Sequence, residues 1–341
     1  MLTSQEFISE CENAPRLNEM SSFFSATAAG LSGTPHKSPV VDLRLIEHDR
    51  DLIAFLSTHG TLWGRFDPHY FGSIPYRLEE EIRLGAALLA YGLNRGRTNA
   101  PVGYYILGAA EGTFARTLAA MAGGSIRTLS CSPTKENGDS FFYYGRPRFA
   151  SFFLGPFHRL TPAYLTSDPI LMPLGGKFDV ILEDTTFQMY SPNRKAQIGF
   201  VKNFLKPGGL FFFVEKFRHD DASEYVRREL QKDYSYKARF FSADEIEQKK
   251  DLILKRMNAN EVTLHDMGNA LAEHFRYACI TWNSGNFYTV AASDDADNLS
   301  ELVARQCAPC IPSEYAYEDL PRSFPGLSLD LPPFRSTVAA R

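Results

Sequence analysis

The chain has 341 residues, of which 44% are hydrophobic and 22% are charged, and its net charge is -4. These values are typical of a soluble globular protein with one large domain or two modest ones, and the acidic balance weighs against nucleic-acid binding by broad phosphate neutralisation. No apolar run reaches the ~18 residues that span a bilayer, and residues 1–17 lack a signal pattern, so we expect a cytoplasmic protein without a membrane partner. Five cysteines, an odd number, do not suggest a disulfide framework.

The N-terminal part is expected to be a helical cap. A small-residue segment at 25–39 is interpreted as a loop, whereas 41–58 and 77–93 carry apolar residues at the three-to-four spacing of helices. The apolar and aromatic stretch 61–76 suits a lid that keeps water away from a ligand, or else it only packs against the following helix. We therefore expect a cap or lid domain at 1–76.

Strand-like runs alternate with helical patterns beyond the cap, at 103–107, 125–130, 149–155, 178–184 and 209–217. Such alternation indicates βαβ units and a mostly parallel sheet. A helical region at 243–274 is followed at 278–293 by two more strand-like pieces around a turn at 283–286. These elements predict one α/β domain at 77–293. The remainder, 294–341, is expected to be an extension that becomes irregular after about residue 311.

A glycine turn, GAAEG, runs from Gly108 to Gly112 between the first strand and the next helix. Glycine is needed where backbone approaches a ligand closely, and such a turn directs N–H groups outward. The spacing matches neither GxGxxG nor GxxxxGK[ST]. Glu111 is unfavourable beside a pyrophosphate but suits a ligand with a cationic or zwitterionic end. The alternative is a plain strand-to-helix turn.

The tip of the second strand reads Ser130-Cys131. Folds that hold a ribose usually carry Asp or Glu at this point. Ser130 can exchange one hydrogen bond with a ribose hydroxyl, but it lacks the charge-assisted bidentate grip of a carboxylate. The polar contacts of a nucleoside would therefore differ from the usual ones.

The segment 178–217 contains a strand ending in Glu183-Asp184, a helix, the turn Lys206-Pro-Gly-Gly, and a buried strand. Together with the glycine turn, this succession resembles class I S-adenosylmethionine (SAM) methyltransferases. The resemblance implies SAM as the cofactor. It also implies a Rossmann-like fold with a mostly parallel seven-stranded sheet and helices on both faces.

A narrower resemblance covers roughly residues 65–293. It rests on GAAEG, Ser132-Pro133, TTFQMY, LKPGG, VEKF, EIEQKK, VTLH and NSGNF. These motifs are similar to those of the carboxy-SAM synthases of the tRNA wobble-uridine pathway. The resemblance implies that Gly108, Ala109 and Gly112 shape the SAM turn and that Tyr76 touches the amino-acid end of SAM.

Other positions depart from that family's pattern. Ser130-Cys131 stand where it has Asp-Asn at the ribose and adenine side, and Pro156-Phe157 replace Asp-Ile beside the adenine, where Phe157 can stack. Asp184, after Glu183, replaces an Asn beneath the sulfonium and adds a favourable negative charge. Lys250 replaces an Arg that holds an extra carboxylate. Because Lys offers a point charge rather than a planar fork, carboxy-SAM synthesis is not the first expectation.

Three functions remain open. The favoured one is a SAM-dependent methyltransferase acting on a small molecule. We expect no nucleic-acid partner for it, and a homodimer is possible. The second is an enzyme that converts SAM itself, by cyclisation with release of methylthioadenosine or by carboxy-SAM synthesis. The third is a non-catalytic SAM-binding protein, motivated by the missing acid at the second strand. Candidate catalytic residues are Tyr76, Tyr190, Glu215 and Lys250, with His265 as a further base.

A lone CxxC motif, Cys307-Ala-Pro-Cys310, lies in the expected extension. A structural zinc needs about four ligands, and no second pair is suitably spaced. We therefore expect ordinary cysteines and no metal.

Overall fold

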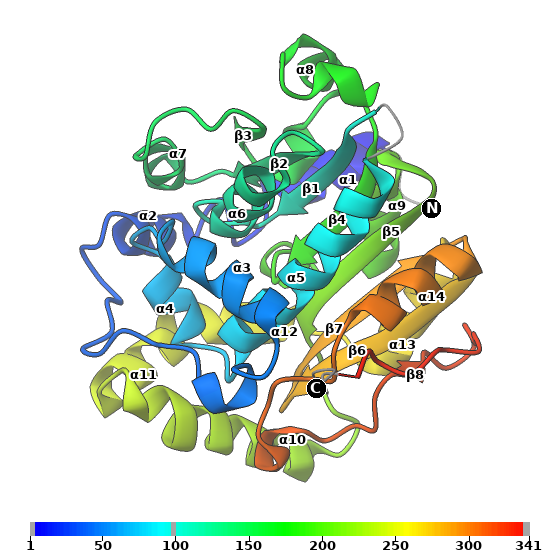
Figure 1. Ribbon diagram of the computed structural model, residues 1–341. Helices are drawn as coiled ribbons and strands as arrows, with labels where there is room; N and C mark the ends of the chain where they lie inside the picture. The colour runs from blue at the N-terminus through cyan, green and yellow to red at the C-terminus, as the bar shows by residue number, and fades with distance from the viewer. Residues whose placement is uncertain (1–3, 97–99, 337–341) are drawn as a thin grey trace.

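The computed structural model describes residues 4–96 and 100–336. Residues 1–3 of the expected cap and 337–341 of the expected extension lie outside these ranges. The chain forms one mixed sheet with helices on both faces (Figure 1). The strands are β1 (Val102–Leu107), β2 (Ile126–Ser132), β3 (Ala150–Leu154), β4 (Phe178–Asp184), β5 (Leu205–Lys216), β6 (Tyr277–Ser284), β7 (Phe287–Ser293) and β8 (Arg322–Ser323).

The strand order is β3-β2-β1-β4-β5-β7-β6-β8. Strands β1 to β5 pair in parallel, whereas β7 is antiparallel to both β5 and β6. The chain runs outward from β1 to β3 and then returns to β4, so the order reverses between β1 and β4. This arrangement confirms the predicted Rossmann-like α/β fold. The expected count of seven strands is exceeded by β8, a two-residue strand that pairs with β6 from the segment expected to be irregular.

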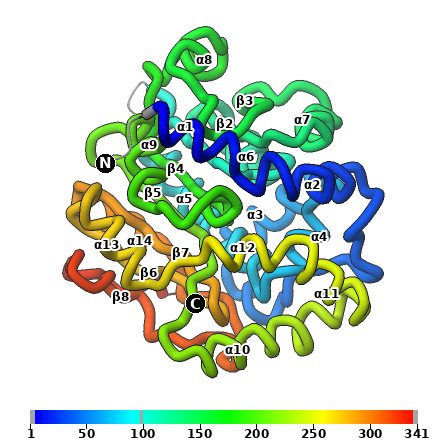
Figure 2. The backbone as a smooth tube through the Cα atoms, turned by 180° about the vertical axis from the view of Figure 1, so that it is seen from behind, coloured from blue at the N-terminus to red at the C-terminus, as the bar shows by residue number. Residues whose placement is uncertain are grey.

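The helices that matter for the site fall before, between and after these strands. They are α1 (Ser4–Glu12), α2 (Ser21–Ala28), α3 (Arg50–Gly60), α4 (Asp67–Phe71), α5 (Arg77–Arg95), α6 (Thr113–Ala122), α7 (Lys135–Phe141), α8 (Pro162–Ser167), α9 (Arg194–Lys202), α10 (Ala222–Leu230), α11 (Ala243–Lys249), α12 (Lys255–Ala259), α13 (Leu264–Ala272) and α14 (Ala296–Arg305). In both views α2, α4 and α11 gather at one side of the molecule (Figures 1 and 2).

Helix boundaries differ from the prediction where side chains cap the backbone. The helix expected at 41–58 begins only at Arg50, because the Asp49 carboxylate accepts hydrogen bonds from the N–H groups of Asp51 and Leu52. Helix α2 covers the start of the expected loop at 25–39. The region 243–274 is broken, because Thr263 forms a capping box that starts α13 anew.

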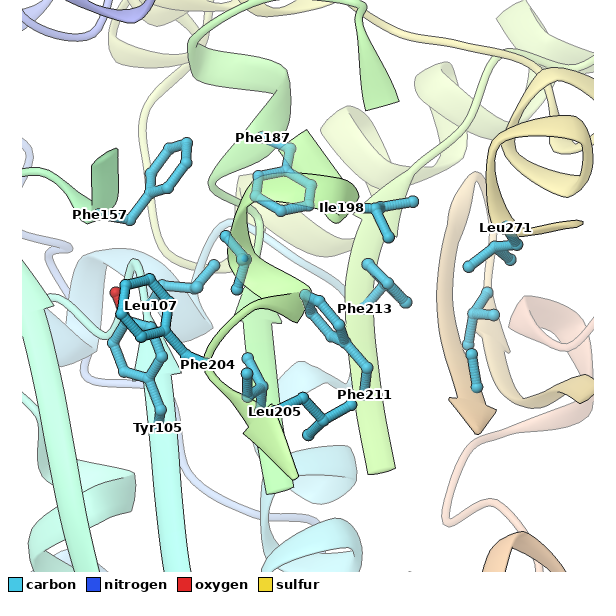
Figure 3. Close-up of a cluster of buried hydrophobic side chains, with 14 of the residues drawn as sticks. Tyr105, Leu107, Phe157, Phe187, Ile198, Phe204, Leu205, Phe211, Phe213 and Leu271 are labelled. Carbon is cyan, nitrogen blue, oxygen red and sulfur yellow. The ribbon is translucent and has the colours of Figure 1, made fainter. Parts of the chain in front are cut away.

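The period-two alternation of the strands divides the core into two layers. Tyr105 and Leu107 of β1 face one layer, which α1, α9 and α13 complete (Figure 3). Tyr104 and Ile106 face the other, completed by α3, α5, α6 and α14. The run Phe211–Phe213 is fully buried, as predicted for a core strand. Both faces of the sheet are thus covered, and a ligand must enter at a strand end.

A buried carboxyl on α5 makes stability depend on pH. Glu79 is 3% exposed, its Oε1 accepts a hydrogen bond from the Asp42 N–H at 2.9 Å, and burial raises the pKa of Glu79 to about 7. Because folding raises the pKa of Glu79, the protonated side chain contributes stability to the folded state. This contribution is fully present below the ordinary pKa of a glutamate and is lost as pH rises toward 7.

We expect Glu79→Gln to raise the free energy of unfolding by about 2–3 kcal/mol at pH 8 and to change it little at pH 5. The amide oxygen can still accept the Asp42 N–H, so the hydrogen bond is kept while the buried charge is removed. Urea denaturation of both proteins at the two pH values measures the difference. An equal effect at both would contradict the assignment.

Candidate functional site

A cavity lies at the carboxyl ends of β1, β2 and β4 and holds about 1370 Å³ of empty space, its mouth included. Gly108, Cys131 and Asp184 bring it to the point where the strand order reverses, which is where open α/β sheets bind ligands. Its walls also include side chains from α2, α4, α11 and α12. The N-terminal part of the chain and the segment before β6 therefore close over the edge of the sheet.

The glycine turn gives the cavity its floor. Gly108 has φ +74°, and an added Cβ would lie 1.6 Å from Thr186 Oγ1 and 2.7 Å from the Asp184 carbonyl oxygen. Gly108 and Ala109 line the cavity. Gly112 does not, because it lies below the turn, where an added Cβ would meet a ring carbon of Phe141 at 2.7 Å. A side chain at Gly112 would therefore disturb packing rather than occupy the ligand's space.

Two carboxyl groups lie beside the turn. Glu111 Oε1 accepts hydrogen bonds from the N–H groups of Phe66 (2.8 Å) and Asp67 (2.9 Å), which ties α4 to the turn. Glu111 Oε2 is buried without a partner among the described residues. Asp67 lines the cavity and accepts from Thr113 Oγ1 at 2.7 Å. Burial, with the nearby Glu111, raises the pKa of Asp67 well above its usual range. A cationic ligand group would relieve this pair.

The tip of β2 is shifted relative to the prediction, because the strand continues to Ser132. Ser130 does not line the cavity; its Oγ is buried below Gly112 without a partner among the described residues. Cys131 lines the cavity, and burial raises the pKa of its thiol to about 11.

The polar groups that reach the cavity from this strand end are Ser132 and Asn137. Asn137 Nδ2 donates to Ser132 Oγ at 2.9 Å, and Asn137 Oδ1 is buried and unpartnered among the described residues. Sequence reasoning missed this pair. A strand extended by two residues would have pointed to Ser132.

Pro156 and Phe157 line the same side of the cavity. Phe157 also belongs to the core, where its ring centroid lies 5.6 Å from that of Phe187 (Figure 3). Its other neighbour is Tyr190, whose ring centroid is 5.0 Å away and which also lines the cavity. Burial raises the pKa of Tyr190 above its usual range. This wall is apolar, with one phenol.

The two acidic residues at the end of β4, Glu183 and Asp184, have different roles. Asp184 lines the cavity, but Arg77 donates to its Oδ2 at 2.9 Å and the Tyr70 hydroxyl donates to its Oδ1. The free negative charge expected beneath a sulfonium is therefore shared with a guanidinium. Glu183 lies outside the cavity, because its carboxylate accepts the N–H groups of Thr186 and Phe187.

At two positions, the residue next to the predicted one lines the cavity. On β5, Glu215 is buried against Arg194 at 2.9 Å outside the cavity, and the next residue, Lys216, lines it. Successive strand residues point to opposite faces. Lys249, the last residue of α11, lines the cavity, whereas Lys250 lies outside it and pairs with Glu247 at 2.7 Å and with Asp233 at 3.2 Å. Helical spacing did not distinguish these two neighbours.

Two further candidates lie elsewhere. Tyr76 precedes α5 with φ 56° and packs against Tyr236 and Tyr315, outside the cavity. His265 is exposed on α13. Of the residues predicted to be catalytic, only Tyr190 lines the cavity.

Within residues 4–96 and 100–336, no group of three or more His, Cys, Asp or Glu side chains could hold a metal ion. The Sγ atoms of Cys307 and Cys310 lie 4.0 Å apart in the buried interior. None of the described helices is long and apolar enough to cross a membrane.

No protein-family model and no curated protein matches this chain. Among solved structures, the chain is similar to the plantazolicin methyltransferase BpumL in complex with SAH (11% identity, covering 85% of this chain and 99% of that one, TM-score 0.43). It is also similar to a SAM-dependent methyltransferase from Aquifex aeolicus (11%, 60% and 87%, TM-score 0.34) and to a probable spermidine synthase from Corynebacterium glutamicum (14%, 67% and 72%, TM-score 0.38). The function is therefore inferred from the cavity itself.

Proposed function

We propose that this chain is a SAM-dependent methyltransferase that acts on a small molecule within the cavity. The observation that carries the proposal is the cavity at the reversal of strand order, where the glycine turn brings the backbone of Gly108 to the wall. Ligands of open α/β sheets bind at this point. When bound, SAM supplies an electrophilic methyl group on a sulfonium.

The lining residues fit the three parts of SAM. Asp67, with Glu111 beside it, would take the ammonium of the amino-acid end, because burial and the nearby Glu111 raise the pKa of Asp67 despite the presence of Arg116, and a cation at the cavity would stabilise its charged form. Asn137, with an unpartnered buried oxygen, would accept a ribose hydroxyl. Phe157 and Pro156 offer an apolar wall for the adenine. In this arrangement, Asn137 takes the role of the Asp or Glu that the end of β2 lacks.

The chain's own part in methyl transfer is chiefly alignment and exclusion of water. Methyl transfer is an in-line displacement, for which holding the reacting groups in line supplies much of the rate. Phe24, Phe66 and Phe71 line the cavity and shield it from bulk water. Tyr190 is the predicted base that lines the cavity, and its raised pKa suits it to position an acceptor by a hydrogen bond rather than to remove a proton at neutral pH.

We expect Asn137→Ala to weaken binding of S-adenosylhomocysteine (SAH) by roughly 5- to 20-fold, the loss of one hydrogen bond to a buried polar group. Asn203→Ala, at an exposed side chain that bonds only to its own helix, is the matched control and should bind SAH normally. Isothermal titration calorimetry measures both. Equal affinity in the two variants would remove Asn137 from the site.

The proposed activity is tested by incubating the pure protein with SAM labelled in the methyl group. With small-molecule acceptors present, the label should move to an acceptor and SAH should accumulate. With SAM alone, no turnover is expected. Formation of methylthioadenosine from SAM alone would instead assign the protein to SAM cyclisation.

Carboxy-SAM synthesis is a second candidate, favoured by one observation. A lysine, Lys249, lines the cavity at the position next to the one expected to hold an extra carboxylate. This reaction needs a donor of the carboxyl group, so it is tested in an incubation that also contains prephenate. Mass spectrometry then distinguishes it, because carboxy-SAM is heavier than SAM and its formation leaves no SAH.

A further inference from the structure

One side of the cavity is basic. Lys216 at the end of β5, Lys232 in the π-helical turn Gln231–Tyr236, Lys237 just after that turn, and Lys249 at the end of α11 all line it. We call these four residues the lysine cluster. Three of them are at most 5% exposed, although lysine is almost never buried without a partner. A second π-helical turn, Lys250–Leu254, follows Lys249, and such turns are frequent at functional sites.

Three carboxylates partner the cluster, and one lysine is left over. Glu229 pairs with Lys216 (2.7 Å) and Lys232 (2.5 Å). The other two partners are Glu261, 2.8 Å from Lys216, and Asp233, 2.9 Å from Lys237. Lys249 forms no salt bridge with any described residue. The four lysines of the cluster therefore have three carboxylate partners, and Lys249 is the one without a salt bridge among the described residues.

The contacts of Lys249 leave one donor free. Its Nζ lies 2.6 Å from His69 Nε2 and 2.7 Å from Ser73 Oγ. His69 donates from Nδ1 to the Gly33 carbonyl oxygen at 2.7 Å, so the neutral ring accepts at Nε2. Burial lowers the pKa of His69 well below its usual range, which keeps the ring neutral. An ammonium has three donors, and two are used here. The third is available to a ligand.

The electrostatics of the cluster favour an added anion. Burial, then repulsion from Lys237 and Lys232, lowers the pKa of Lys249 well below its usual range, while Asp233 acts in the opposite direction. Burial and Lys232 lower the pKa of Lys237 to about 7, against the opposing effect of Asp233. An anion next to Lys249 would supply the missing counter-charge and favour the ammonium form. Binding would then take up a proton.

Apolar side chains also line the cavity. They include Phe23, Phe24, Phe66, Phe71, Ile74 and Phe287. A ligand that contacts both the lysine cluster and these apolar side chains has a hydrophobic body and one anionic group.

We propose that the acceptor is a small carboxylic acid with an aromatic or other apolar body, and that its carboxylate binds Lys249. One unpaired lysine matches a singly charged carboxylate better than a doubly charged phosphate. This inference rests on the proposed methyltransferase function, since it names the substrate class of the same cavity. The anion site can nevertheless be tested without SAM.

Calorimetry tests the proposal with benzoate, phenylacetate and phenylpropanoate, each compared with its uncharged amide. We expect at least one carboxylate to bind more tightly than its amide, and Lys249→Met to weaken it roughly 10- to 100-fold, the value of one buried charge-assisted hydrogen bond. Lys255→Met is the matched control, because Lys255 is exposed and pairs only with the exposed Asp251. It should bind like the wild type.

A second readout separates a binding role for Lys249 from a purely structural one. Measured between pH 7 and pH 10 in buffers of different ionisation enthalpy, carboxylate binding should take up protons in the wild type where Lys249 titrates, and Lys249→Met should lose this part of the uptake but keep any that comes from Lys237. SAH affinity should be unchanged in that variant, which also shows that it is folded.

Some outcomes would overturn the inference. They are equal binding of carboxylates and amides, no binding of either, tighter binding of phenyl phosphate, or an unchanged affinity in Lys249→Met. If carboxylates bind as expected but SAH does not, the proposed function fails and the anion site stands.

Discussion

Gly108→Ala should abolish SAH binding and lower the free energy of unfolding by about 2–4 kcal/mol. The added Cβ would lie 1.6 Å from Thr186 Oγ1 and 2.7 Å from the Asp184 carbonyl oxygen, and the residue would have to keep φ +74°. Relief of this collision requires movement of Asp184, at the end of β4, and of Thr186, in the loop that follows. Calorimetry gives the affinity, and urea denaturation gives the stability.

The matched control is Gly123→Ala. Gly123 also has a positive φ, +56°, but nothing lies within 4 Å of an added Cβ. This variant therefore carries the backbone strain without the collision, costs about 1–2 kcal/mol, and should bind SAH normally. If the two variants lost affinity equally, the effect of Gly108 would be general destabilisation and not its place at the cavity.

Arg77→Met should cost about 3–5 kcal/mol, because it leaves two buried carboxylates without their cation. Arg77 is fully buried and lies 2.9 Å from Asp184 and 3.1 Å from Glu81. The loss should shrink as pH falls, since protonation neutralises the uncompensated carboxyl groups. Urea denaturation at several pH values measures both effects.

The double variant Arg77→Met with Asp184→Asn should regain part of the lost stability, because it removes one uncompensated charge. Lys135→Met supplies the contrast. Its partner, Asp139, lies 2.7 Å away, but both side chains are exposed, so we expect a cost within about 0.5 kcal/mol. If Arg77→Met and Lys135→Met lowered the free energy of unfolding by similar amounts, burial would not explain the effect of Arg77.

Strands and core could be predicted because their signals are local. The run Phe211–Phe213 and the alternation in β1 fix which side chains are buried. Helix boundaries were less accurate, since they depend on caps: Asp49 moves the start of α3, and Thr263 divides the region after α12. The short β8 could not be foreseen, because it forms only by pairing with β6, distant in sequence.

Part of the site was predicted to the residue, since Gly108, Cys131 and Asp184 line the cavity. Other candidates missed it, because the cavity is lined by Ser132, Lys216 and Lys249 and not by Ser130, Glu215 and Lys250. A shift of one residue reverses the face of a strand and turns a helix by about 100°. The partners of Asp184 could not be inferred either, because Arg77 and Tyr70 come from segments far away in the sequence.

Titration of SAH into the wild-type protein, Gly108→Ala and Gly123→Ala tests whether the cavity at the β1–β4 reversal binds SAM. We expect one-to-one binding to the wild type and to Gly123→Ala, and none to Gly108→Ala. Absence of binding to the folded wild-type protein, or equal binding to all three, would contradict this expectation.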